Sequence, residues 1–262
     1  TGCPPGAQAQ RVLGIDVSAW QGNISNSDWA TLKQPVSEGG DERDFVFIRS
    51  SRGGRTGYYN QSDANNLEGE NTLSQRYDDP YFVQNITRAT AAGMFAGTYH
   101  FSRPDIIEST LNSGGIANNG TDEANHFIQM AGAWMRPGYL LPVHDFEAGD
   151  GKRTDNEMAQ FVIDFSNRIH EFARVRPFIY VNGNYASNIL GGASTALRNQ
   201  VVAGNLLWSA RWPNQSNPNA ILVQTAHPKD SFSAIYGPWD DAPNPTHPWR
   251  FWQYASTARL EG

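Results

Sequence analysis

Short apolar runs of strand length recur along the whole sequence, and segments with helical periodicity separate the early ones. The runs span residues 11–18, 44–51, 94–101, 139–147, 176–182, 205–212, 220–226 and 249–256. Strands that alternate with helices are typical of a parallel sheet. The pattern therefore predicts an α/β fold, a TIM-like (β/α) barrel of eight strands.

The helical periodicity is confined to the first two thirds of the chain, in residues 28–37, 80–92, 121–135 and 156–174. The last of these segments has one apolar stripe at spacings of three and four, formed by Met158, Phe161, Val162, Phe165, Ile169 and Phe172. After Val181, clusters of Pro, Asn and Gly separate the apolar runs instead. We therefore expect incomplete helices in the second half of the barrel.

Three polar stretches, residues 53–79, 104–120 and 213–248, are too long for ordinary connections. They are interpreted as inserted loops that can shape a binding site. No internal repeat and no sharp linker divides the chain. The sequence thus predicts a single barrel domain over residues 11–262, preceded by a disordered leader over residues 1–10.

Composition and charge exclude several classes of function. The net charge is -6, and the 20 Lys and Arg residues are scattered, which does not match the basic patch of a nucleic-acid-binding protein. No apolar stretch approaches the roughly 18 residues of a membrane-spanning helix. Cys3 is the one cysteine, so neither a disulfide framework nor a thiolate metal cluster is expected.

Two acids end the fourth apolar run, in the stretch LPVHDFE. Strand alternation places Asp145 and Glu147 on one side of the strand and Phe146 on the other. Parallel barrels carry their chemistry at the carboxyl ends of the strands. Burial and a neighbouring acid disfavour ionisation, so one of the pair could remain protonated as a general acid. Solvated acids in an exposed loop are the alternative.

A third acid, Asp16, follows the apolar residues of the first run and precedes a Trp-Gln-Gly turn. An acid in this position is often only a helix cap or a turn former. Because Asp16 lies at the end of a predicted strand, as Asp145 and Glu147 do, it is a candidate for the same pocket.

Amphipathic aromatic residues recur near the ends of several predicted strands, and the chain contains eight tryptophans. Core packing explains some aromatic residues, such as Phe45, Phe47 and Phe178. Trp and Tyr at strand ends also suit the apolar faces and hydroxyls of sugars, which indicates a carbohydrate-binding groove. The candidates are Tyr99, Phe101, Tyr180, Trp208, Trp212, Trp252 and Tyr254.

His100 is interpreted as a hydrogen-bonded structural residue, because no second histidine stands at metal-ligand spacing. We expect no metal and no other cofactor.

Several of these motifs, in order, resemble the glycoside hydrolase family 25 lysozymes, the N-acetylmuramidases. The motifs are GIDVSAWQG, GTYHF, LPVHDFE, FIYVN, LLWSARW and FWQYAS, and they cover most of the chain from Gly14 to Ser256. The resemblance implies a (β/α) barrel that hydrolyses the β-1,4 bond between N-acetylmuramic acid and N-acetylglucosamine in peptidoglycan. It also implies a monomer that is secreted or located in the cell envelope.

Residue roles also follow from the resemblance. Glu147 falls on the proton donor, Asp145 on the neighbouring catalytic acid, and Asp16 on the first-strand acid of the same pocket. The residues that would line the sugar site are Tyr99, Tyr180, Trp208, Trp252 and Gln253.

Two features depart from the family pattern. The family commonly has another active-site aspartate after the WQY strand, and residues 255–262 contain none. The insertions 53–79 and 213–248 are also longer than expected. Two other functions therefore remain open: a non-hydrolytic glycan-binding barrel, and a chitinase-like glycosidase. The chitinase motif needs further acids upstream on the strand, where this chain has Leu141 and Val143.

Overall fold

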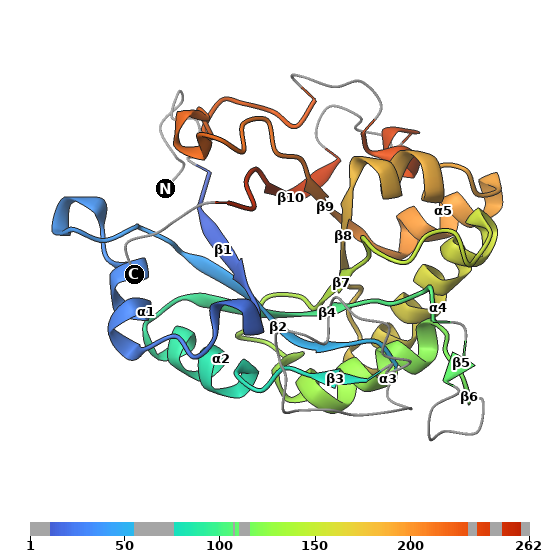
Figure 1. Ribbon diagram of the computed structural model, residues 1–262, viewed down its shortest axis with the longest axis horizontal. Coiled ribbons are helices and arrows are strands. Elements are labelled where there is room, and N and C mark those ends of the chain that lie inside the picture. The colour runs from blue at the N-terminus through green and yellow to red at the C-terminus, as the bar shows by residue number, and fades with distance from the viewer. Residues whose placement is uncertain are drawn as a thin grey trace, which may run out of the picture.

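Seven parallel strands form one curled sheet, which Figure 1 shows with helices along its outer face. The computed structural model describes residues 11–54, 76–106, 108–109, 116–229, 235–241 and 248–257. The sheet order is β1-β2-β4-β7-β8-β9-β10. These strands span Gly14–Val17, Phe45–Arg52, Phe95–Phe101, Val143–Asp145, Phe178–Asn182, Leu206–Ala210 and Trp249–Gln253.

Three short strands lie outside this parallel order. Strand β3 (Tyr77–Asp78) pairs antiparallel with the end of β2. Strands β5 (Glu108–Ser109) and β6 (Ile116–Ala117) form a separate antiparallel pair. The predicted leader and residues 55–75 of the first predicted insertion lie outside the described residues.

The helices lie where the periodicity predicts them, in the first part of the chain. They are α1 (Asn26–Lys33), α2 (Phe82–Ala91), α3 (Gly120–Ala131) and α4 (Asp155–Ala173). A π-helical segment (Tyr185–Leu190) and α5 (Thr195–Gly204) lie after Val181, where the apolar pattern indicated no helix. Capping boxes at Ser25 and Thr154 start α1 and α4. After β9, the only helical elements in the described residues are short 3-10 turns, so the second half has incomplete helices, as predicted.

The predicted strand at residues 220–226 is wrong. A 3-10 turn (Pro218–Ala220) precedes it, and Leu222 is 75% exposed. The guanidinium of Arg11 donates to the carbonyl oxygens of Val223 and Ala226, which a strand would offer to a neighbouring strand. The apolar run therefore lacks both the buried faces and the ladder of a parallel strand.

Two apolar layers hold the sheet in place. One fills the inside of the curl, with Phe47, Val143, Phe178 and Trp208 among its buried residues. The other packs between the sheet and the helices. The stripe of α4 belongs to this outer region except for Phe172, which is 46% exposed in the last turn of the helix.

The curl remains open between its two edge strands. No backbone pairing joins β1 to β10 in the described part of the chain. No helix among the described residues is long and apolar enough to cross a bilayer.

Candidate active site

Three carboxyl groups face one cavity at the carboxyl end of the parallel strands. Asp16 lies in β1, Asp145 ends β7, and Glu147 follows two residues later. All three line an inner cavity of about 160 Å³. Phe146 points the other way, into the core beside Phe161 of α4. The strand alternation in HDFE thus brings both acids to the same cavity.

The inner cavity joins a larger cleft of about 650 Å³ that runs along the open edges of β1 and β10. Asp16 and Glu147 line both spaces, whereas Asp145 lines only the inner one. Glu147 is therefore the acid of the β7 pair that faces the cleft. A ligand in the cleft can therefore contact both Glu147 and Asp16.

Burial, together with the charge of Asp16, raises the pKa of Glu147 to about 7. A carboxyl with this pKa holds its proton at mildly acidic pH, where an ordinary glutamate has lost it. Glu147 is thus suited to deliver a proton to a leaving oxygen near neutral pH.

Asp145 is 7% exposed, and its Oδ1 atom has no hydrogen-bond partner. Burial raises its pKa well above the usual value, the charges of Glu147 and Asp16 add to the rise, and Arg49 opposes it. Adjacent buried carboxyls resist double ionisation, so the pair titrates as a unit. A proton on Glu147 lets Asp145 carry the negative charge.

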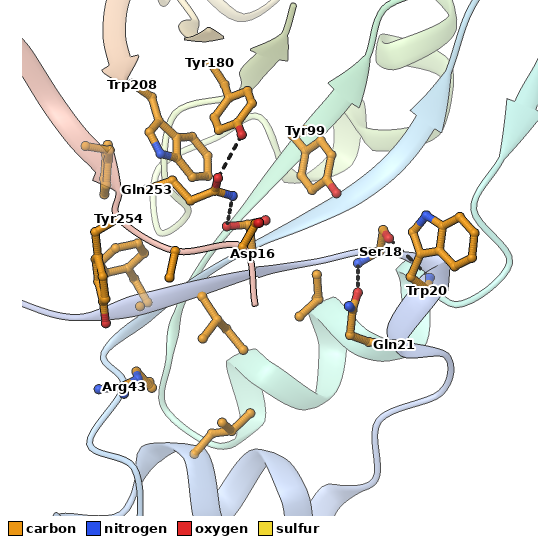
Figure 2. Close-up of a pocket in the computed structure, with 18 of the residues that line it drawn as sticks. Asp16, Ser18, Trp20, Gln21, Arg43, Tyr99, Tyr180, Trp208, Gln253 and Tyr254 are labelled. Atoms are coloured by element: carbon orange, nitrogen blue, oxygen red, sulfur yellow. Dashed lines mark hydrogen bonds between the residues drawn. The ribbon is translucent and has the colours of Figure 1, made fainter. Parts of the chain in front are cut away.

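A hydrogen-bond chain links Asp16 to the opposite edge of the sheet (Figure 2). The Nε2 atom of Gln253 donates to Oδ2 of Asp16 at 2.9 Å. The hydroxyl of Tyr180 donates to Oε1 of Gln253 at 2.8 Å. Burial raises the pKa of Asp16, and the bond from Gln253 opposes that rise.

The structure adds Arg49, which the sequence analysis did not select. It lies in β2 and is the one cation among the described residues that line the inner cavity. Its Nε atom pairs with Oδ2 of Asp79 at 3.3 Å, and its guanidinium lies 5.2 Å from the ring centre of Tyr77. The signal in the sequence was a charged residue two positions after Phe47, on the side of the strand that also carries Phe45 and Phe47.

Aromatic side chains form much of the cleft wall. Six of the aromatic residues selected from the sequence line it: Tyr99, Tyr180, Trp208, Trp212, Trp252 and Tyr254. The seventh, Phe101, lines the inner cavity. Trp20, which was not selected, also lines it and is 59% exposed. Figure 2 shows the rings of Tyr99, Tyr180 and Trp208 around Asp16.

His100 lies outside this cavity, on the helix side of β4. Its Nδ1 atom bonds to Oγ of Ser51 at 2.8 Å, and its Nε2 atom lies 3.2 Å from Oε2 of Glu123. Its interpretation as a structural histidine is confirmed. No group of three or more potential metal-binding side chains is found in the described ranges.

Comparison with known proteins places this geometry in a family. The family model described as glycosyl hydrolases family 25 matches residues 15–262. The chain belongs to this family. It is accordingly a glycoside hydrolase with the TIM-like fold that the sequence motifs predicted.

Individual relatives agree with the family assignment. The chain is 27% identical to lysozyme M1 of Streptomyces globisporus over 98% of its own length and 66% of that protein. A lysozyme structure from Streptomyces coelicolor is 25% identical, with a TM-score of 0.59 over 97% of this chain and 88% of the other. A family GH25 lysozyme from Aspergillus fumigatus shares the fold at 21% identity, with a TM-score of 0.58, over 96% and 90% of the two chains.

Proposed function

We propose that the protein is a muramidase that cleaves the β-1,4 bond between N-acetylmuramic acid and N-acetylglucosamine in bacterial peptidoglycan. The observation that carries this proposal is the group of three carboxyls in a cavity that shares Asp16 and Glu147 with an aromatic-lined cleft, with a pKa of about 7 at Glu147. Its relatives include a protein named lysozyme M1, and lysozymes cleave this bond. Such a protein acts outside the cytoplasm, on the cell wall.

In this proposal, Glu147 protonates the leaving glycosidic oxygen from the cleft side. Asp145, deeper in the cavity, holds the negative charge next to the reacting sugar ring. The acetamido oxygen of that sugar attacks the anomeric carbon, the glycosidic bond breaks, and water then opens the cyclic intermediate. Asp145 accepts the N–H of the acetamido group and stabilises its developing positive charge. No metal or other cofactor is needed for these steps.

The sugar-binding surface in this proposal consists of Tyr99, Tyr180, Trp208 and Trp252. Trp208 lines both the inner cavity and the cleft and is 5% exposed. The other rings offer flat apolar faces for stacking. Gln253 is considered separately below, because its amide groups are engaged within the protein.

The function is tested by incubating the purified protein with bacterial cell walls and, in parallel, with chitin. We expect the turbidity of the walls to fall while reducing ends appear, with much less release from chitin. Greater release from chitin would favour a chitinase-like enzyme. Wall binding without release of reducing ends would identify a non-hydrolytic glycan-binding protein.

The pH dependence follows from the state of Glu147. The general acid must be protonated, and its pKa is raised to about 7, so kcat/KM should fall above about pH 7 by tenfold per unit. The raised pKa values of Asp145 and Asp16 should place the acidic limb above the usual range of an aspartate. The measurement is kcat/KM on soluble wall fragments between pH 3 and pH 9. A profile that is flat to pH 9 would mean that Glu147 is not the proton donor.

The stereochemistry of the product tests the role of the acetamido group. Attack by this group followed by water gives net retention, so the first-formed reducing sugar should be the β-anomer. Proton NMR recorded before mutarotation distinguishes the two anomers. An initial α-anomer would show direct attack by a water molecule instead.

A further inference from the structure

The open side of the sheet lies within the candidate active site. The edge strands β1 and β10 do not pair in the described part of the chain, and the cleft follows the gap between them. Asp16 projects from one edge and Gln253 from the other. Their hydrogen bond of 2.9 Å crosses this gap and joins residues 237 positions apart.

The amide of Gln253 can take only one orientation. Two donors converge on its oxygen: the hydroxyl of Tyr180 at 2.8 Å and the indole Nε1 of Trp212 at 2.7 Å. The indole N–H can only donate, so the atom that it approaches must be the oxygen. The nitrogen is therefore the atom directed at Asp16.

We infer that Gln253 is a positioning residue that fixes the Asp16 carboxyl across the open side of the barrel, and that it is not primarily a ligand of the sugar. The oxygen of its amide already accepts two hydrogen bonds, and its nitrogen donates one to Asp16. The inference rests on the proposed function for the catalytic role of Asp16. The hydrogen bonds of Gln253 themselves do not depend on the substrate.

The hydrogen bond from Gln253 affects both the orientation and the charge of the Asp16 carboxyl group. The groups that face its pocket are Arg49 from β2, Tyr99 from β4, Asp145 and Glu147 at β7, and Tyr180 from β8. Two of these are acids, and burial also disfavours the charge on Asp16. The N–H of Gln253 opposes both effects, because a donor stabilises a carboxylate. Without it, Asp16 should rotate more freely and retain a proton to higher pH.

Gln253→Glu is the sharpest variant, because it keeps the shape and the oxygen that Tyr180 and Trp212 contact. It replaces the N–H donor by a carboxylate oxygen facing Asp16. We expect the carboxyl of Asp16 to titrate about one pH unit higher or more. We also expect kcat to fall by about 10- to 100-fold, as a misplaced catalytic group does, with KM changed less than about threefold. Gln253→Asn, which shortens the side chain without adding charge, should move both quantities in the same direction by less.

Gln215→Glu is the matched control. Gln215 bonds to Ser256 shortly after β10, so the variant places the same added charge near the same strand without facing Asp16. It should leave kcat and the titration of Asp16 near their parent values.

The titration is followed by carbon-13 NMR of the carboxyl groups, with Asp16 assigned by Asp16→Asn, and kcat and KM are measured on soluble wall fragments. A raised KM with unchanged kcat and unchanged titration of Asp16 would overturn the inference and make Gln253 a sugar ligand. If the parent protein releases no reducing ends, the proposed function fails, but the NMR titration of Gln253→Glu still decides the positioning role.

Discussion

Glu147→Gln should leave a folded protein that releases reducing ends from cell walls about 100- to 10,000-fold more slowly than the parent, the range that a positioned general acid contributes. The amide has the shape of the acid but cannot deliver a proton to the leaving oxygen. Glu147 faces the cleft, and its pKa of about 7 keeps it protonated at mildly acidic pH, as the reaction requires. Initial rates at pH 5 to 6 measure the effect. Activity near that of the parent would assign the proton donor to another residue.

A measurement of stability distinguishes this loss of activity from a loss of folded protein. In the parent, Glu147 binds a proton more tightly when folded than when unfolded, so its contribution to stability is greatest at low pH and is lost as the pH rises from about 4.5 through 7. The total fall from this group is up to about 3 kcal/mol. Glu147→Gln has no such group and should be as stable as the parent at pH 4, and more stable at pH 8. Urea unfolding at both pH values provides the control.

Asp145→Asn should be the second most damaging change, lowering kcat by about 100- to 1,000-fold, in the range seen when a preorganised electrostatic contact is removed. Asp145 is buried and lines the inner cavity, where the acetamido group of a bound substrate would lie against its carboxyl group. The amide cannot carry the negative charge that stabilises the developing positive charge on that group. KM should change little, because the contact strengthens mainly in the transition state.

Asp16→Asn is the comparison for this variant. Asp16 is held by Gln253 and is expected to contribute positioning and electrostatic stabilisation rather than a proton. Its loss should therefore lower the rate less than the loss of Asp145 or Glu147. Steady-state kinetics of the three amide variants on one wall preparation give the ranking. A larger loss in Asp16→Asn than in Asp145→Asn would exchange the roles of the two aspartates.

Much of the fold could be predicted because apolar runs and helical stripes are local signals. The run that ends in HDFE became β7, and the stripe of α4 is buried at five of its six positions. The run at 220–226 is also apolar but lacks a neighbouring strand edge, and a strand depends on that non-local contact. Local sequence therefore could not separate seven strands from eight.

The part of the candidate site that follows from strand geometry could be predicted from the sequence. Parallel strands end at one side of the sheet, so the acids of β1 and β7 could be assigned to one cavity in advance. The role of Arg49 could not, because its position depends on Asp79 and on the packing of β3 against β2. The bond between Gln253 and Asp16 joins two edges that share no backbone pairing, and nothing in the spacing of the two residues predicts it.

The new reducing end in a digest of peptidoglycan tests the central claim most directly. The digest is reduced with borohydride and hydrolysed, and the sugar alcohols are identified by mass spectrometry. A muramidase of the proposed kind produces the alcohol of muramic acid, and the Glu147→Gln variant produces almost none over the same time. Formation of the alcohol of glucosamine, or equal yields from the two proteins, would contradict the account.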